Sequence, residues 1–158
     1  MKIICWNVQG AKKSQLRHEV EFINRTIKPY ILILLKTLVN CQNTDLIIKQ
    51  LGYRFYSTIP PINHTGGIWL LWNDENVEVS IIAKETQIMH CLILDKLTAK
   101  ECLVSAVYAP ARESQKTSFW QHLKQPHNSI DKPMCLMGDS NEMLNASEKN
   151  CRHFAQSN

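Results

Sequence analysis

The sequence contains six cysteines, but no two of them are separated by only two or three residues. Zinc knuckles and related structural zinc sites take such closely spaced cysteines as ligands, so a site of this kind is not expected. Several of the cysteines lie inside apolar runs, where a reduced thiol packs as a small hydrophobic side chain. A reducing compartment fits this usage best, and we expect an intracellular protein of the nucleus or cytoplasm that is not secreted.

The sequence also lacks a long apolar run. The N-terminal apolar stretch gives way to polar residues at Asn7, which is too soon for a signal peptide. The run Ile31–Leu35 is far shorter than the roughly 20 residues that a membrane-spanning helix needs. We therefore expect no membrane partner.

No strong or concentrated charge is present. The formal net charge is +4, and the only local basic cluster is Lys12, Lys13 and Arg17, which a solvated helix face explains at least as well as a binding surface. This charge tolerates a polyanionic partner such as DNA without demonstrating one. Repeats, low-complexity tracts and linkers are absent as well, the length suits one domain, and nothing points to a protein partner.

What the sequence does contain is a succession of short apolar segments separated by turn residues. We expect a helix that begins near Ser14 as its cap, directs Leu16, Val20, Phe22, Ile23 and Ile27 toward a core, and ends before Pro29. Further helices are expected at 44–51 and 113–124. Strands are expected at 2–8, 30–35, 53–57, 67–72, 77–83, 87–94, 101–108 and, as a final buried strand, 134–137. This order predicts two sheets covered by helices, an α/β fold.

Polar side chains follow two of the apolar strands. Asn7 ends the first strand, and Asp139 and Asn141 follow the last one. The carboxyl ends of strands are where α/β proteins build their sites. An Asp and an Asn two residues apart on an extended segment point the same way, so the carboxylate could take a proton from water that the amide orients. Taken alone, the Asp139-x-Asn141 pattern is more simply an Asx turn after a strand.

Three segments together resemble the endonuclease/exonuclease/phosphatase superfamily in spacing and order: Ile3–Gly10, Val107–Pro110 and Gly138–Glu142. Other pieces narrow the resemblance to the endonuclease domain of plant non-LTR (LINE-type) retrotransposons, which is related to abasic-site endonucleases. These pieces are Gly66–Trp72, Arg112 followed by Phe119–Leu123, and Met143-Leu144 leading to Glu148-Lys149. The resemblance implies a four-layer sandwich of two sheets flanked by helices. It covers residues 1–158 but only the first part of the family's domain, so we expect a fold that is incomplete at its C-terminus.

The resemblance implies hydrolysis of a phosphodiester bond in DNA with a divalent cation, usually Mg²⁺. Asn7 matches a residue that helps to hold the metal and the phosphate, and Tyr108 matches one that contacts the phosphate. Asp139 matches the residue that activates or positions the attacking water, with help from the residue that Asn141 matches. Magnesium prefers oxygen ligands and neutralises charge that develops on phosphate oxygens, so this residue set suits the chemistry.

The sequence departs from the family pattern at two points. Lys36 occupies the position of the metal-binding Glu, and an ammonium has no lone pair to give a metal. At a separation of about 4 Å and an effective dielectric of about 20, each unit charge is worth roughly 4 kcal/mol, so the change from −1 to +1 costs about 8 kcal/mol before relaxation. The family's terminal Asp-His pair is also missing, and Cys151-Arg152-His153 does not supply it. We therefore expect a truncated, catalytically inactive copy.

Two other functions are compatible with the sequence. The same fold could carry a phosphatase or sphingomyelinase activity, although the Gly66-Gly67 strand and the Phe119-Trp120 helix favour the retroelement branch. The chain could instead be a non-catalytic module that binds nucleic acid, with salt-sensitive binding to duplexes. In a bolder version of this hypothesis, the Lys36 ammonium stands where the metal would be and lets the cleft hold a phosphate passively.

Overall fold

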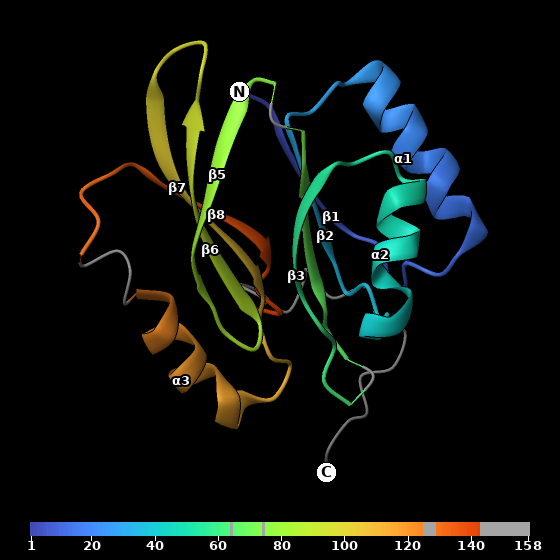
Figure 1. Ribbon diagram of the computed structural model, residues 1–158. Helices are drawn as coiled ribbons and strands as arrows, with labels where there is room; N and C mark the ends of the chain where they lie inside the picture. Colours follow the sequence, from blue (N-terminus) through green and yellow to red (C-terminus); the bar gives the residue numbers. More distant parts are fainter. Residues whose placement is uncertain (64, 74, 125–128, 143–158) are drawn as a thin grey trace.

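Two four-stranded sheets pack face to face in the computed structural model, which describes residues 1–63, 65–73, 75–124 and 129–142 (Figure 1). The order of strands in the first sheet is β1 (Ile3–Asn7), β2 (Ile31–Leu35), β4 (Ile68–Trp72) and β3 (Phe55–Ile59). The order in the second sheet is β5 (Val77–Lys84), β6 (Ile88–Asp95), β7 (Lys100–Tyr108) and β8 (Met134–Asp139). The predicted α/β fold with two helix-covered sheets is confirmed.

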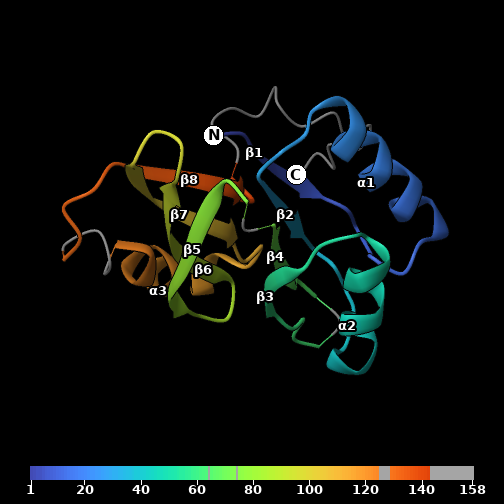
Figure 2. The same cartoon turned by 45° about the horizontal axis from the view of Figure 1, so that its top comes forward.

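Each sheet contains one parallel pair of strands, and each pair is joined by a helix. The helix α1 (Ser14–Thr26) connects β1 to β2, and α3 (Glu113–Lys124) connects β7 to β8. A parallel pair requires a crossover of this kind, whereas the other pairs of strands are antiparallel. The helices α1 and α2 (Cys41–Gln50) cover the outer face of the first sheet, and α3 lies against the second (Figures 1 and 2).

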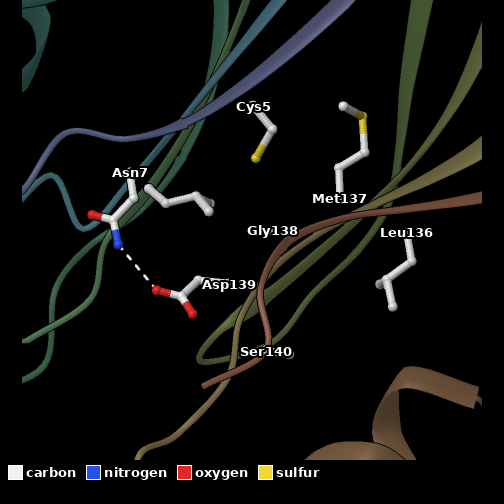
Figure 3. Close-up of a pocket in the computed structure, with 8 residues that line it drawn as sticks. Cys5, Asn7, Leu136, Met137, Gly138, Asp139 and Ser140 are labelled. Carbon is white, nitrogen blue, oxygen red and sulfur yellow. Dashed lines mark hydrogen bonds between the residues drawn. The ribbon is translucent and has the colours of Figure 1, made fainter. Parts of the chain in front are cut away.

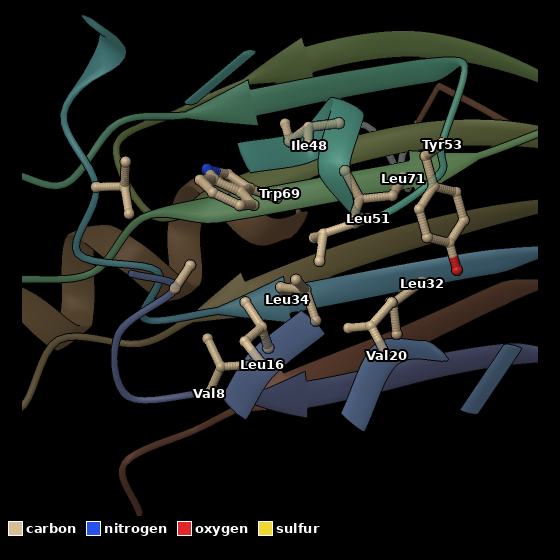
Figure 4. Packing of buried hydrophobic residues seen from close by; sticks show 12 residues of the cluster. Val8, Leu16, Val20, Leu32, Leu34, Ile48, Leu51, Tyr53, Trp69 and Leu71 are labelled. Atoms are coloured by element: carbon tan, nitrogen blue, oxygen red, sulfur yellow. The ribbon is translucent and has the colours of Figure 1, made fainter. Parts of the chain in front are cut away.

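The strand β2 lies at the centre of the hydrophobic core. Its residues Leu32 and Leu34 face the helices α1 and α2, where they pack with Val20 and Ile48 (Figure 4). The alternate residues of the strand face the second sheet, and all five of its residues are buried. A strand that is covered on both faces reads as a continuous apolar run, which explains why its sequence shows no alternation.

Three details of the sequence interpretation are wrong. Phe22 and Ile27 do not reach the core, since 66% and 42% of their surfaces are exposed. Ser14 is the first residue of α1, Lys13 stands at the cap position, and no side chain caps the helix. The strand β8 is not buried, because 47% of Leu136 is exposed; only β7 pairs with β8 among the described residues, so the strand lies at a sheet edge.

None of the described helices combines the length and the apolar character needed to cross a membrane. Several residues that carried the sequence interpretation lie outside the described part of the chain. They are Met143, Leu144, Glu148, Lys149 and the segment Cys151–His153.

Candidate active site

The ends of two strands from different sheets meet at one point. Asn7 is the last residue of β1, and Asp139 is the last residue of β8. The amide Nδ2 of Asn7 donates a hydrogen bond of 3.0 Å to Oδ2 of Asp139, across 132 positions of sequence (Figure 3). The structure thus brings together the two polar strand ends that the sequence singles out.

The strand registers explain this convergence. Asn7 pairs with Leu35, whose side chain lies in the core between the sheets, and neighbours in register point to the same face. Asp139 pairs in the same way with Tyr108, which packs against that core from the second sheet. Asn7, Tyr108 and Asp139 therefore all project into the space between the sheets, at the carboxyl ends of their strands.

Asn141 does not have the extended backbone that the argument from strand alternation assumes. It lies beyond the end of β8 with φ at 46°, and its backbone N–H donates to Oδ1 of Asp139 at 3.0 Å. Its side-chain Nδ2 donates to the carbonyl of Ala109 at 2.6 Å. The simpler interpretation of the pattern, an Asx turn, is thus present. Asn141 ties the end of β8 to the end of β7 and so positions Asp139.

Lys36 follows Leu35 directly, at the same end of the first sheet as Asn7. Its φ of 53° turns the chain out of β2, and its carbonyl accepts a hydrogen bond of 2.9 Å from the N–H of Gly10. The side chain of Lys36 is half-buried. The next residue, Thr37, packs so closely on Gly67 that a Cβ there would overlap its hydroxyl, which explains the glycine in this turn.

A pocket of about 470 Å³ opens beside the Asn7–Asp139 pair (Figure 3). Burial raises the pKa of the Cys5 thiol in this pocket to about 11, with further increases from the negative charge of Asp139 and from Cys135. At neutral pH this thiol is protonated, so Cys5 is not a nucleophile. The residues that line the pocket are Cys5, Asn7, Leu35, Leu136, Met137, Gly138, Asp139 and Ser140.

The oxygen atoms at the strand ends do not form the magnesium site that the resemblance implies. The buried Oδ1 of Asn7 has no hydrogen-bond partner and is a suitable ligand. Asp139 accepts one hydrogen bond on each carboxylate oxygen, and each oxygen keeps a further lone pair. Among residues 1–63, 65–73, 75–124 and 129–142, no three His, Cys, Asp or Glu side chains lie close enough to share a metal ion. With Lys36 at the position where the resemblance implies a second carboxylate, the described residues do not fit this metal.

Sequence reasoning missed an ion pair next to the site. Lys116 of α3 is nearly buried, and its Nζ lies 2.9 Å from Oε1 of Glu142. This contact holds the segment after β8 against α3. Lys116 stands three and seven residues before the buried Phe119 and Leu123, so helical periodicity could have indicated that it lies on the inner side of the helix.

A second missed pair lies in the interior of the second sheet. Nδ1 of His90 and Oγ of Ser105 are 2.7 Å apart, on directly opposite positions of β6 and β7. Cys91 lies on the other face of β6, in the core between the sheets, so His90 and Cys91 do not form a dyad. A Ser–His pair can serve nucleophilic catalysis, but both residues are buried and neither lines a described pocket, so this pair is structural.

The two four-stranded sheets flanked by helices match the fold of endonuclease/exonuclease/phosphatase structures, among them the AP endonuclease LMAP from Leishmania major. No family model matches the sequence, and no curated protein matches it. Solved structures do match it: the endonuclease domain of TRAS1, a telomere-specific non-LTR retrotransposon, has a TM-score of 0.65 at 15% identity over 90% of this chain and 61% of that one.

Two other solved structures support the same fold. An endonuclease/exonuclease/phosphatase family protein from Bacteroides thetaiotaomicron has a TM-score of 0.67 at 11% identity, over 89% of this chain and 63% of that one. The human Nocturnin catalytic domain has a TM-score of 0.61 at 15% identity, over 90% of this chain and 65% of that one. The chain thus spans less than two thirds of the length of these proteins, and at such identities the likeness establishes the fold alone.

Proposed function

We propose that this chain is a degenerate form of a divalent-metal-dependent DNA endonuclease of the retrotransposon type, and that it does not hydrolyse phosphodiester bonds. The observation that carries the proposal is the hydrogen bond between Asn7 and Asp139, which joins the carboxyl ends of β1 and β8 beside an open pocket. The fold shared with the TRAS1 endonuclease domain is compatible with the retrotransposon branch. The resemblance of the sequence to plant elements supports a plant-type ancestor.

The roles proposed next are those that these residues would have had in an active ancestor, and they follow from where the side chains lie. Asp139 would position or deprotonate a water molecule, because its carboxylate is fixed by Asn7 on one oxygen and by the backbone of Asn141 on the other. Tyr108, in register with Asp139 and facing the same space, would contact a phosphate oxygen. Asn7 would contribute its unpartnered Oδ1 to a cation.

The proposed loss of activity rests on Lys36. Lys36 directly follows Leu35, the β2 residue in register with Asn7. A positive charge therefore lies at the strand end where a metal-dependent enzyme needs a negative one. Hydrolysis without the cation would leave the charge on the phosphate oxygens without compensation, and such electrostatic stabilisation is commonly the largest contribution to catalysis.

Magnesium binding and DNA cleavage test the proposal together. We expect no nicking of supercoiled plasmid above background and no rise in melting temperature with Mg²⁺ for the unchanged chain. Lys36→Glu should create a magnesium-dependent rise in melting temperature, because it puts a carboxylate directly after Leu35, the register partner of Asn7. Lys28→Glu is the matched control, since Lys28 has the same φ of 53° but lies in the loop between α1 and β2.

Nicking by the unchanged chain that Asp139→Asn abolishes would contradict the proposed inactivity. A magnesium response that is equal in both Glu variants would contradict the placement of Lys36 at the metal position. The readout for Lys36→Glu is magnesium binding and not nicking, because binding tests position 36 by itself. Duplex binding that persists in EDTA and weakens in Lys36→Ala would favour the non-catalytic nucleic-acid-binding module instead.

A further inference from the structure

The turn after β2 is tied to the segment that follows Asn7. The N–H of Gly10 donates to the carbonyl of Lys36 at 2.9 Å, and the N–H of Ala11 donates to the carbonyl of Thr37 at 2.7 Å. The backbone of Lys36 is left-handed, with φ at 53°, a conformation that residues other than glycine seldom adopt. Such a backbone persists only where its surroundings hold it, and it is commonest at functional sites. The contacts that hold residue 36 therefore bear on the candidate site.

The opposite side of this turn lies against the two glycines that precede β4. The N–H of Thr37 donates to the carbonyl of Gly67, and the N–H of Leu38 donates to the carbonyl of Gly66, each at 3.3 Å. The side chain of Thr37 is fully buried, and its hydroxyl has no hydrogen-bond partner among the described residues. The hydroxyl instead occupies the space in which a Cβ of Gly67 would lie. Because Gly67 has no side chain, Thr37 and the turn that carries it can close onto β4.

The two neighbouring glycines differ in what a side chain would meet. Gly66 has φ at 77° and Gly67 has φ at 90°, so both backbone conformations favour glycine. A Cβ on Gly67 would overlap the hydroxyl of Thr37, whereas a Cβ on Gly66 would make an ordinary contact of 3.6 Å with the ring of Tyr108. Of these two glycines, only Gly67 allows a close approach of the turn after β2.

We propose that Thr37 and Gly67 are positioning residues of the candidate site, and that their contact fixes the direction in which the side chain of residue 36 leaves the turn. Neither residue lines the pocket beside Asn7, so both act through the backbone of residue 36. Residue 36 belongs to the site only through the proposed function, on which this inference rests. Its side chain is then directed before any ligand binds, which is how a supporting contact preorganises a site.

Alanine at each glycine separates the close approach from backbone strain. Gly67→Ala should speed amide exchange of Gly10, whose N–H bonds to the carbonyl of Lys36, by roughly tenfold or more, and should shift the backbone NMR signals of Lys36. Gly66→Ala is the matched control, because it has a similar φ without the overlap, and it should leave both readouts unchanged. Thr37→Ala removes the hydroxyl, so Thr37→Ala/Gly67→Ala should recover most of the slow exchange.

Equal acceleration of Gly10 exchange in Gly66→Ala and Gly67→Ala would overturn the proposal, because backbone strain alone would then explain the effect. Exchange in the double variant that stays as fast as in Gly67→Ala would overturn it too. If Gly67→Ala does not fold, the proposal requires that Thr37→Ala/Gly67→Ala does, and an unfolded double variant overturns it. Neither readout uses magnesium or nicking, so these outcomes leave the proposed function untouched. A missing magnesium response in Lys36→Glu would in turn leave the contact between Thr37 and Gly67 untouched.

Discussion

The strands β2 and β8 have similar sequences but very different surroundings. Both are apolar, both follow a crossover helix, and both pair in parallel with an earlier strand. Leu34 of β2 is fully buried, whereas Leu136 of β8 is 47% exposed. The difference arises because β2 lies between two strands and two layers, while β8 has a neighbour on one side only among the described residues. An apolar run thus shows that a strand can be buried, but not that it is buried.

Replacing one leucine by alanine in each strand measures the difference in burial most directly. We expect Leu34→Ala to lower the free energy of unfolding by about 2–5 kcal/mol, because it leaves a cavity in a closed core. Leu136→Ala should lower it by less than about 1 kcal/mol, since the side chain is already half in water. Urea unfolding gives both values. Equal losses would mean that β8 is covered in solution.

Most of the fold could be predicted from the sequence because its signals are local. The run Ile31–Leu35, the turn at Gly66-Gly67 and the periodicity of residues 113–124 fix a strand, a turn and a helix without reference to the rest of the chain. The exposure of Phe22 and Leu136 could not be predicted, because it depends on which element lies next to each of them. Local pattern gives the elements, and only tertiary packing gives their burial.

The candidate site divides in the same way. Asn7 and Asp139 could be placed at strand ends from the sequence, and the structure brings them within hydrogen-bonding distance. The bond from Asn141 to Ala109, the ion pair between Lys116 and Glu142 and the contact of His90 with Ser105 join elements that the sequence does not connect. Long-range contacts of this kind leave no periodic pattern in the sequence, so they cannot be predicted from it.

A smaller effect is expected at the glycine that lets β8 approach β7. A Cβ on Gly138 would overlap the carbonyl oxygen of Val107. We expect Gly138→Ala to cost about 1–3 kcal/mol, as overpacking does, and to reduce amide-exchange protection in β8 by separating the two strands. Gly52→Ala is the control, because Gly52 has φ at 83° but nothing within 4 Å of its Cβ position. It should cost about 1 kcal/mol from backbone strain and leave the protection of β8 unchanged. Loss of protection in both variants would show that strain alone loosens the sheet.

The smallest effect is expected in the covered part of the second sheet, two strands away from β8. Burial lowers the pKa of His90, and the nearby charge of Glu85 opposes this change in part. An unfolded histidine titrates at about pH 6.5, so as the pH falls below that value the unfolded chain takes up a proton that the folded chain resists. Stability should therefore fall from about pH 6.5 downward and level off once the folded pKa has been passed.

His90→Gln should reduce the slope of unfolding free energy between about pH 7 and about pH 5.5. His18→Gln, on the exposed side of α1, is the matched control substitution. If His90→Gln and the unchanged chain have the same slope of unfolding free energy against pH, then burial does not disfavour protonation of His90. The covered and exposed parts of the second sheet would then differ less than their burial implies.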